Sequence, residues 1–207
     1  MDANSSAKIF LSKDSRNSYA TVVDPQFSMA TTNSTLYTRV SSDVTAISKI
    51  QYDSTIMRVA QWFLSMDSMS NKKLQKLCYY AYCWFIVFFN DVEAISENNI
   101  NEIHVLCPEG FQAWIHGPVC FPLYCRYKVY GWHNIPKAEF KPTVTDELES
   151  LFRQVWDAYG SYTADELEAI SHREQPWQNA RKGIRNCEAC ANKISAYEIL
   201  KYYSSLG

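Results

Sequence analysis

The chain has 207 residues, of which 47% are hydrophobic and 14% aromatic, and its formal net charge is -2 at pH 7. This apolar content suffices for a hydrophobic core, and the length fits one domain with an extension. The nearly balanced charge gives no general reason to expect non-specific binding to nucleic acid or to an anionic membrane. We expect no signal peptide, and the most apolar run, residues 81–89, is too short to span a bilayer.

The sequence contains seven cysteines, an odd number, and the chain is too large to need a disulfide framework. We therefore expect buried free thiols and a cytoplasmic location. Cys187 and Cys190 have the spacing of half a zinc site, but a closed site needs two more ligands and no second pair has this spacing. The six glycines form no phosphate-binding loop. The sequence thus predicts neither a metal ion nor another cofactor.

Residues 1–53 differ in composition from the rest of the chain, since they are rich in serine and threonine and contain no tryptophan, cysteine or glycine. Within them, residues 35–40 alternate weakly between apolar and polar, which indicates a short strand. We expect an N-terminal extension, either loosely packed or acting as an arm that becomes ordered on a partner. The folded domain is then assigned to residues 54–207.

After residue 53 the apolar residues recur with a helical period. Asp53 or Ser54 can cap a first helix, and Ser70 can cap a second one. The stripe of the second helix consists of Leu74, Leu77, Cys78, Ala81, Tyr82 and Phe85. Residues 86–89 extend the apolar surface to every side, so we expect this helix to be central.

The helical period is lost after residue 98. Two short apolar runs, residues 103–106 and 111–114, flank a turn that contains proline and glycine, so a small hairpin is predicted there. A second break at Gly117 precedes a helix that we expect to run to Tyr130 and to end at Gly131.

The clearest helical pattern begins at Thr145, a suitable N-cap that is followed by acidic residues in the first turn. Thr163 and Glu166 have the spacing of a capping box for a short helix. Ser195 and Glu198 have the same spacing and predict a capping box at the start of a last helix. Together these patterns predict a mainly α protein. Its architecture would be a compact multi-helix domain with a small β-hairpin and an N-terminal extension.

His172 and Glu174 lie in a predicted loop between helices, where a histidine and a carboxylate could act as a general base. However, the local sequence marks no serine or cysteine as a nucleophile. Pro176 and Trp177 fit a structural corner, with the proline in the first turn of a helix and the tryptophan buried. We therefore favour a structural or binding role over catalysis for this segment.

Lys72, Lys73 and Lys76 cluster at the start of the second helix, where cations oppose the helix dipole and so do not serve helix stability. Arg181, Lys182 and Arg185 form a second group. Each group is either a solvated helix face or a contact for an acidic or nucleic-acid partner. The fourteen tyrosines include several on helices, such as Tyr80 and Tyr124, and aromatic residues of this kind are favoured at protein interfaces.

Three groups of motifs, taken in order, resemble a known family. The first is Lys73-Leu74-Gln75-Lys76-Leu77 with Tyr79-Tyr80-Ala81; the second is Phe111-Gln112-Ala113-Trp114 with Gly117-Pro118-Val119 and Leu123-Tyr124; the third is Tyr159-Gly160 with His172, Glu174, Pro176-Trp177 and Ala180-Arg181. On these motifs, residues 56–203 resemble a Panacea domain, also described as SocA-like, which occurs in bacterial and phage proteins. Phe121-Pro122 departs from the pattern, because an acidic residue often opens the helix there.

The resemblance implies an antitoxin of a toxin–antitoxin system, which neutralises a cognate protein toxin by direct contact and is not an enzyme. It names no toxin and supplies no catalytic residues. We expect the partner to contact the N-terminal arm and the exposed parts of seven residues: Lys73, Lys76, Tyr80, His116, Tyr124, His172 and Glu174.

Three other functions stay open on the sequence alone. The first is a proteolytic adaptor that delivers a toxin to a cytoplasmic protease, as the resemblance to the SocA branch implies. The second is an enzyme that uses His172 and Glu174. The third is binding to DNA through the lysine cluster, against which the net charge argues weakly.

Overall fold

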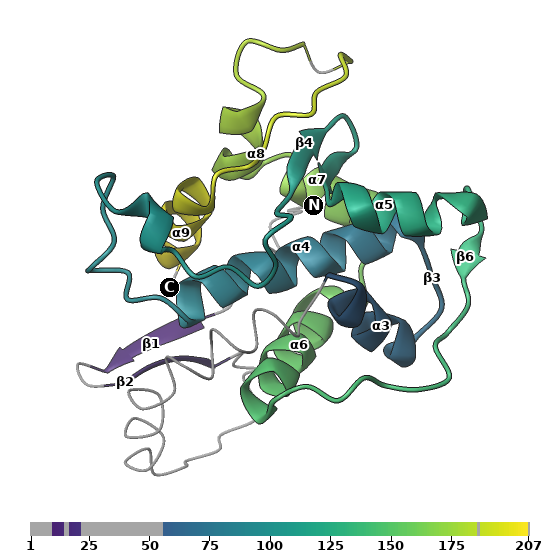
Figure 1. The fold of residues 1–207 in the computed structure, drawn as a ribbon, viewed down its shortest axis with the longest axis horizontal. Coiled ribbons are helices and arrows are strands. Elements are labelled where there is room, and N and C mark those ends of the chain that lie inside the picture. Colours follow the sequence, from purple (N-terminus) through teal and green to yellow (C-terminus); the bar gives the residue numbers. More distant parts are fainter. Residues whose placement is uncertain (1–9, 15–16, 22–55, 186, 207) are drawn as a thin grey trace, which may run out of the picture.

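The computed structural model describes residues 10–14, 17–21, 56–185 and 187–206. Within these ranges the chain forms seven α-helices, two short 3-10 helices and three two-stranded antiparallel sheets (Figure 1). The helices are α3 (Ile56–Met66), α4 (Asn71–Phe88), α5 (Phe121–Tyr127), α6 (Asp146–Tyr159), α7 (Ala164–Ser171), α8 (Gln175–Ala180) and α9 (Ala196–Ser204), with 3-10 turns η1 (Ile100–Glu102) and η2 (Lys128–Tyr130). The predicted mainly α, multi-helix architecture is confirmed for this part of the chain.

The strands pair as β1 (Phe10–Asp14) with β2 (Asn17–Thr21), β3 (Met69–Ser70) with β6 (Asn134–Ile135), and β4 (Gln112–Trp114) with β5 (Gly117–Val119). The β1–β2 pair belongs to the N-terminal extension. The strand predicted at residues 35–40 and the predicted caps Asp53 and Ser54 lie outside the described residues. In the part that the structure describes, no helix is both long enough and apolar enough to cross a membrane.

Helix α4 is the centre of the fold, as its continuous apolar run predicted. The Ser70 hydroxyl accepts a hydrogen bond from the Lys73 backbone N–H at 3.3 Å and so caps the helix. Every residue from Leu74 to Val87 is buried, because α3, α5, α6, α7 and α9 all contact this helix. Figure 1 shows α4 crossing the middle of the molecule with the other helices around it. A helix enclosed on all sides has no solvent face for its polar residues.

Helix α6 packs beside α3 through an aromatic cluster. The rings of Trp62 and Phe152 lie 5.5 Å apart, and Phe63 lies 5.9 Å from Phe152. The Trp62 indole N–H donates to the Glu149 carboxylate at 2.6 Å, which satisfies the one polar group of the buried tryptophan. The Thr145 hydroxyl caps α6 by accepting from the Leu148 N–H at 3.4 Å, as predicted.

A small hairpin is present, but it is not the predicted pair of residues 103–106 with residues 111–114. Its strands are β4 and β5, joined by Ile115 and His116, and residues 103–106 form no strand. The Asn90 side chain takes the place of a strand partner there, since it accepts from the His104 N–H at 2.7 Å and donates to its carbonyl at 2.9 Å. On its other side, β4 meets residues 192–194, because Ala113 N–H donates to the Asn192 carbonyl at 2.9 Å.

The remaining helix predictions are met with small changes. The helix expected up to Tyr130 begins at Phe121 and tightens into η2 before Gly131, whose φ of +55° ends it. The Thr163–Glu166 capping box is present in full at the start of α7. Ser195 caps α9, but the Glu198 carboxylate accepts from the Asn179 amide at 2.6 Å.

Candidate functional site

The residues of the three motif groups meet where α7 and β5 pack on the first half of α4 and where Glu174 begins α8. Lys76 reaches this junction from α4 and is only 1% exposed. Its ammonium group donates to the Pro118 carbonyl of β5 at 3.2 Å. Burial lowers the pKa of Lys76 to about 7, because the interior solvates the charged form poorly. We call this region, comprising Lys76, Gly117, Pro118, Ser171 and Glu174, the buried junction.

Gly117 allows the buried junction to close. Its φ of +92° is a conformation that residues with a side chain rarely adopt. A Cβ at this position would lie 2.7 Å from Cε of Lys76 and 2.8 Å from Oγ of Ser171. Ser171 is fully buried and donates its hydroxyl to the Glu168 carbonyl at 2.9 Å. A glycine therefore lets β5, α4 and α7 approach one another at one point.

Glu174 connects the buried junction to the C-terminal helix. Its carboxylate accepts a hydrogen bond from the Tyr203 hydroxyl of α9 at 2.9 Å, and the residue is 5% exposed. Burial raises the pKa of Glu174 to about 7, although the tyrosine hydrogen bond acts in the opposite direction. Nearby, the rings of Tyr80 and Tyr159 stack with centroids 4.0 Å apart and join α4 to α6.

Trp177 and Arg181 of the α8 segment hold the β4 strand in place. The Trp177 indole N–H donates to the Trp114 carbonyl at 3.1 Å. The Arg181 guanidinium donates to three carbonyls: Ala113 at 2.9 Å, Arg185 at 3.0 Å and Glu188 at 2.7 Å. Its carbon also lies 5.1 Å from the Trp177 ring centre. The predicted structural corner at Pro176 and Trp177 is therefore present, and Arg181 is part of it.

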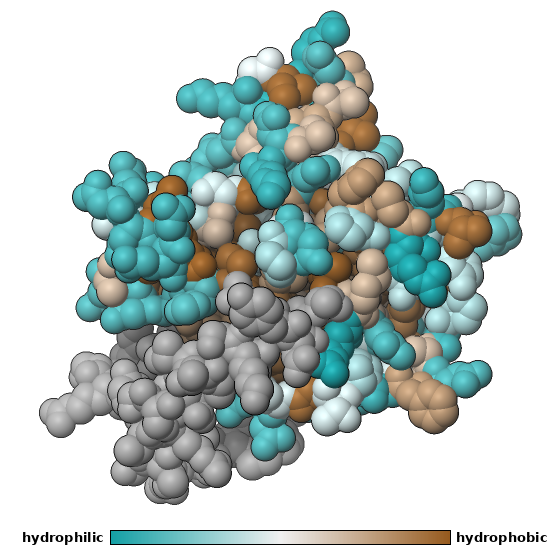
Figure 2. Space-filling view, viewed as in Figure 1, coloured by the Kyte–Doolittle hydropathy of each residue, from teal (hydrophilic) through white to brown (hydrophobic). Residues whose placement is uncertain are grey.

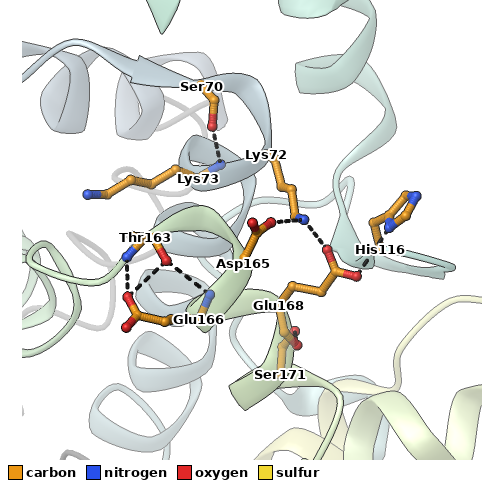
Figure 3. A network of polar contacts seen from close by, with 9 residues as sticks. All are labelled: Ser70, Lys72, Lys73, His116, Thr163, Asp165, Glu166, Glu168 and Ser171. Carbon is orange, nitrogen blue, oxygen red and sulfur yellow. Dashed lines mark hydrogen bonds and ion pairs between the residues drawn. The ribbon is translucent and has the colours of Figure 1, made fainter. Parts of the chain in front are cut away.

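A second, exposed network lies beside the buried junction (Figure 3). Lys72 forms ion pairs with Asp165 at 2.7 Å and with Glu168, whose other carboxylate oxygen lies 3.1 Å from Nδ1 of His116. Partial burial alone would raise the pKa of Glu168, but the hydrogen bonds from Lys72 and His116 lower it. Lys73 points elsewhere and donates to the Gly160 carbonyl at 2.6 Å. These contacts tie the start of α4 to α7.

The structure places the seven predicted binding residues in two groups. The expectation of exposed surface is wrong for Lys76, Tyr80 and Glu174, which are 1%, 0% and 5% exposed. They are enclosed because α4 is covered on every side and because α7 and β5 lie against its first half. The residues that reach the surface at least in part are Lys73, His116, Tyr124 and His172. The solvated face expected for Arg181 is also absent, since Arg181 is 4% exposed.

His172 and Glu174 have different surroundings. The His172 ring stacks on Trp177 with centroids 4.1 Å apart, and the residue lines a pocket of about 320 Å³. Glu174 does not line this pocket and bonds Tyr203 instead. The Nε2 atom of His172 is buried without a hydrogen-bond partner in the described part. The two side chains therefore do not act as an acid–base pair in this arrangement.

The thiols and carboxylates give no metal site within the ranges described: no three side chains of histidine, cysteine, aspartate or glutamate are placed to hold an ion. All seven cysteines are free, and four of them are buried. Burial raises the pKa of the Cys78, Cys83 and Cys107 thiols well above the usual range, so these three remain protonated and unreactive at neutral pH.

Two features of the structure were missed from the sequence. One is the close approach at Gly117, for which the only local signal is a glycine next to a proline. The other is a set of large exposed apolar side chains between residues 121 and 140, among them Trp132 and Phe140. A tryptophan directly after Gly131, in a stretch broken by Pro136 and Pro142, could have indicated it.

The fold and the buried junction define a mainly helical domain whose motif residues serve chiefly to hold its segments together. Comparison of the chain with protein-family models, with curated proteins and with solved structures found no match. The function proposed below therefore rests on the resemblance of the motifs and on their geometry.

Proposed function

We propose that this chain is the antitoxin of a toxin–antitoxin system and neutralises a cognate protein toxin by binding to it directly. Under this proposal the protein is not an enzyme, and it acts in the cytoplasm of a bacterial or phage-infected cell. Residues 56–203 provide the folded platform. The toxin contacts its surface, including the exposed parts of Lys73, His116, Tyr124 and His172, and the N-terminal extension.

The observation that carries the proposal is the convergence of the motif residues. Lys76, Gly117-Pro118 and Glu174 are separated by 41 and 56 positions in sequence, yet they meet in one buried junction. Trp177 and Arg181 bind the strand that ends at Trp114, another of the motif residues. A scaffold that a family shares requires its signature residues to hold the fold together. The motif residues of this chain meet this requirement, which supports the resemblance on which the proposal rests.

The geometry also favours binding over catalysis. Of the residues predicted as an acid–base pair, Glu174 is enclosed in the interior and His172 is stacked on an aromatic ring, and Lys76 is enclosed as well. By contrast, several large apolar side chains in the described part are exposed, and Trp132 is 85% exposed. Exposed aromatic residues of this kind are characteristic of the energetic centres of protein interfaces.

The proposal is tested by co-expression with the product of the neighbouring gene. That product alone should stop growth of a host strain, and the full chain should restore growth and purify together with it. Rescue should weaken when His116→Ala and Tyr124→Ala are combined. The matched control is Lys182→Ala with Lys193→Ala, which changes two exposed residues away from the expected contact.

The level of the neighbouring product separates direct neutralisation from proteolytic delivery. Direct neutralisation predicts that the product stays abundant and bound during rescue. Its loss during rescue, and its recovery in a protease-deficient host, would instead indicate an adaptor. Absence of both rescue and association would overturn the antitoxin proposal.

A further inference from the structure

The segment from Phe121 to Lys141, which we call the α5–α6 edge, carries an unusual share of exposed apolar surface. It contains four of the six large hydrophobic side chains that are most exposed in the described part: Phe121 at 51%, Val129 at 80%, Trp132 at 85% and Phe140 at 74%. In Figure 1 the α5 and β6 parts of this segment form one side of the molecule. In Figure 2 apolar and hydrophilic residues alternate on that side.

Part of this surface is held in a fixed arrangement. The β6 strand pairs with β3, which anchors Asn134 and Ile135 to the start of α4. Trp132 lies two residues before this strand, and its ring stacks on the adjacent, exposed His133 ring with centroids 3.9 Å apart. The anchored strand therefore presents an exposed tryptophan that a partner can cover.

A pocket of about 400 Å³ lies between the α5–α6 edge and α3. Its wall includes Met57 and Leu64 from α3 and Tyr127, Tyr130 and Ile135 from the edge. Gln61 and Arg126 also line the pocket, so its lining is both apolar and polar. The mixed lining can receive an apolar side chain, and Arg126 favours one whose neighbours in sequence carry negative charge.

The charge of the α5–α6 edge indicates the sign of its partner. The edge contains four cationic residues, Arg126, Lys128, Lys137 and Lys141, and one acidic residue, Glu139. Lys141 pairs with Glu149, whereas the other three cations form no ion pair within the described residues. By contrast, residues 91–109 contain five acidic residues and neither lysine nor arginine. The edge is thus a cationic region on a chain whose net charge is -2.

We propose that the α5–α6 edge docks an acidic segment of a protein partner, which inserts a large apolar side chain into the pocket beside Arg126. This inference rests on the proposed function for the identity of the partner, which is the toxin. It adds that the α5–α6 edge is the face that binds the toxin. Charge complementarity selects an acidic segment, and the exposed apolar side chains Val129, Trp132 and Phe140 favour a polypeptide, whose own apolar side chains can cover them. Residues 1–55 are a poor occupant because they contain five acidic and five basic residues.

The test uses synthetic peptides with the full chain. One peptide has a leucine flanked by aspartate and glutamate; a second has glycine in place of the leucine; a third has lysine in place of the acids. A mixed-sequence single-stranded RNA is the fourth probe. Binding is followed by tryptophan fluorescence and by NMR shifts, and only the acidic leucine peptide should perturb Trp132 and the pocket.

Charge reversal then locates the contact. Arg126→Glu combined with Lys128→Glu should weaken binding of the acidic leucine peptide roughly tenfold or more. The control Lys182→Glu with Lys193→Glu changes the net charge equally at exposed positions outside the edge and should leave binding nearly unchanged. Equal effects of the two double variants would overturn the proposal, and so would tighter binding of the RNA than of the acidic peptide.

Two further outcomes separate this inference from the proposed function and from self-association. Growth rescue that survives Trp132→Ala and the charge reversal would overturn the edge as the toxin-binding face but leave the antitoxin function intact. Peptide binding at the edge without rescue by the unaltered chain would support the docking surface and contradict the antitoxin function. Concentration-dependent oligomers that the charge reversal dissociates would show a second copy as the occupant, which would also overturn the proposal.

Discussion

Gly117→Ala is the substitution that most directly tests the packing of the buried junction. An alanine there must adopt a φ near +92°, which costs about 1–2 kcal/mol relative to glycine. Its Cβ would also lie 2.7 Å from Cε and 2.9 Å from Nζ of Lys76, well inside contact distance. Overpacking of this kind costs about 1–3 kcal/mol. We therefore expect the free energy of unfolding to fall by roughly 2–5 kcal/mol, a large share of a typical domain stability.

Gly183→Ala is the matched control for this prediction. Gly183 also has a positive φ, +84°, but a Cβ there would meet no atom within 4 Å. The control therefore carries the backbone cost of about 1–2 kcal/mol without the crowding. The difference between the two variants, about 1–3 kcal/mol, isolates the contact with Lys76 and Ser171.

Urea unfolding followed by circular dichroism measures both variants, and a double-mutant cycle identifies the atoms responsible. Lys76→Ala removes both lysine atoms that the new Cβ would meet, so it should reduce the cost of Gly117→Ala by about 0.5–3 kcal/mol. If Gly117→Ala is no more destabilising than Gly183→Ala and the cycle shows no coupling, the close approach described at Gly117 is incorrect.

Three further predictions concern the same segments. Arg181→Lys cannot replace the hydrogen bonds of the guanidinium to three carbonyls, so the urea midpoint should fall by the equivalent of about 2–4 kcal/mol, unlike the exposed Arg185→Lys. Because the pKa of Glu174 is raised to about 7, the folded chain binds more protons than the unfolded chain between about pH 4.5 and pH 7, so its stability falls as the pH rises through that window. Glu174→Gln keeps an acceptor for the Tyr203 hydroxyl and should remove this fall in stability. An unchanged pH profile of the variant would contradict the raised pKa. Thr163→Ala removes the first half of the capping box and should cost about 1 kcal/mol by thermal or urea unfolding, with no effect counting against the cap.

The helices and their starts could be predicted because their signals are local. Ser70, Thr145 and Thr163 each bond a backbone N–H three residues on, so the residues that decide the helix start are adjacent in sequence. The central position of α4 followed from an apolar run that leaves no polar face. Such information is contained within one helix and needs no knowledge of the tertiary fold.

The partners of the hairpin strands and the contacts of the buried junction depend on residues that are distant in sequence. Local patterns could therefore not predict them. The strand expected at 103–106 is replaced by bonds to Asn90, and β4 finds an additional partner in residues 192–194. Lys76 looked like a solvated cation, but its acceptor is a carbonyl 42 positions away. Glu174 is likewise buried by Tyr203, which lies in the last helix.

The central claim is that this chain neutralises its partner by covering it and not by chemical turnover. The most direct test is a titration of the purified product of the neighbouring gene with the purified full chain, followed by the toxic activity of that product. Neutralisation by binding predicts that activity falls linearly to an endpoint at a fixed molar ratio and returns when the complex is dissociated and separated. Complete and lasting inactivation by a small molar fraction of the chain would contradict this account.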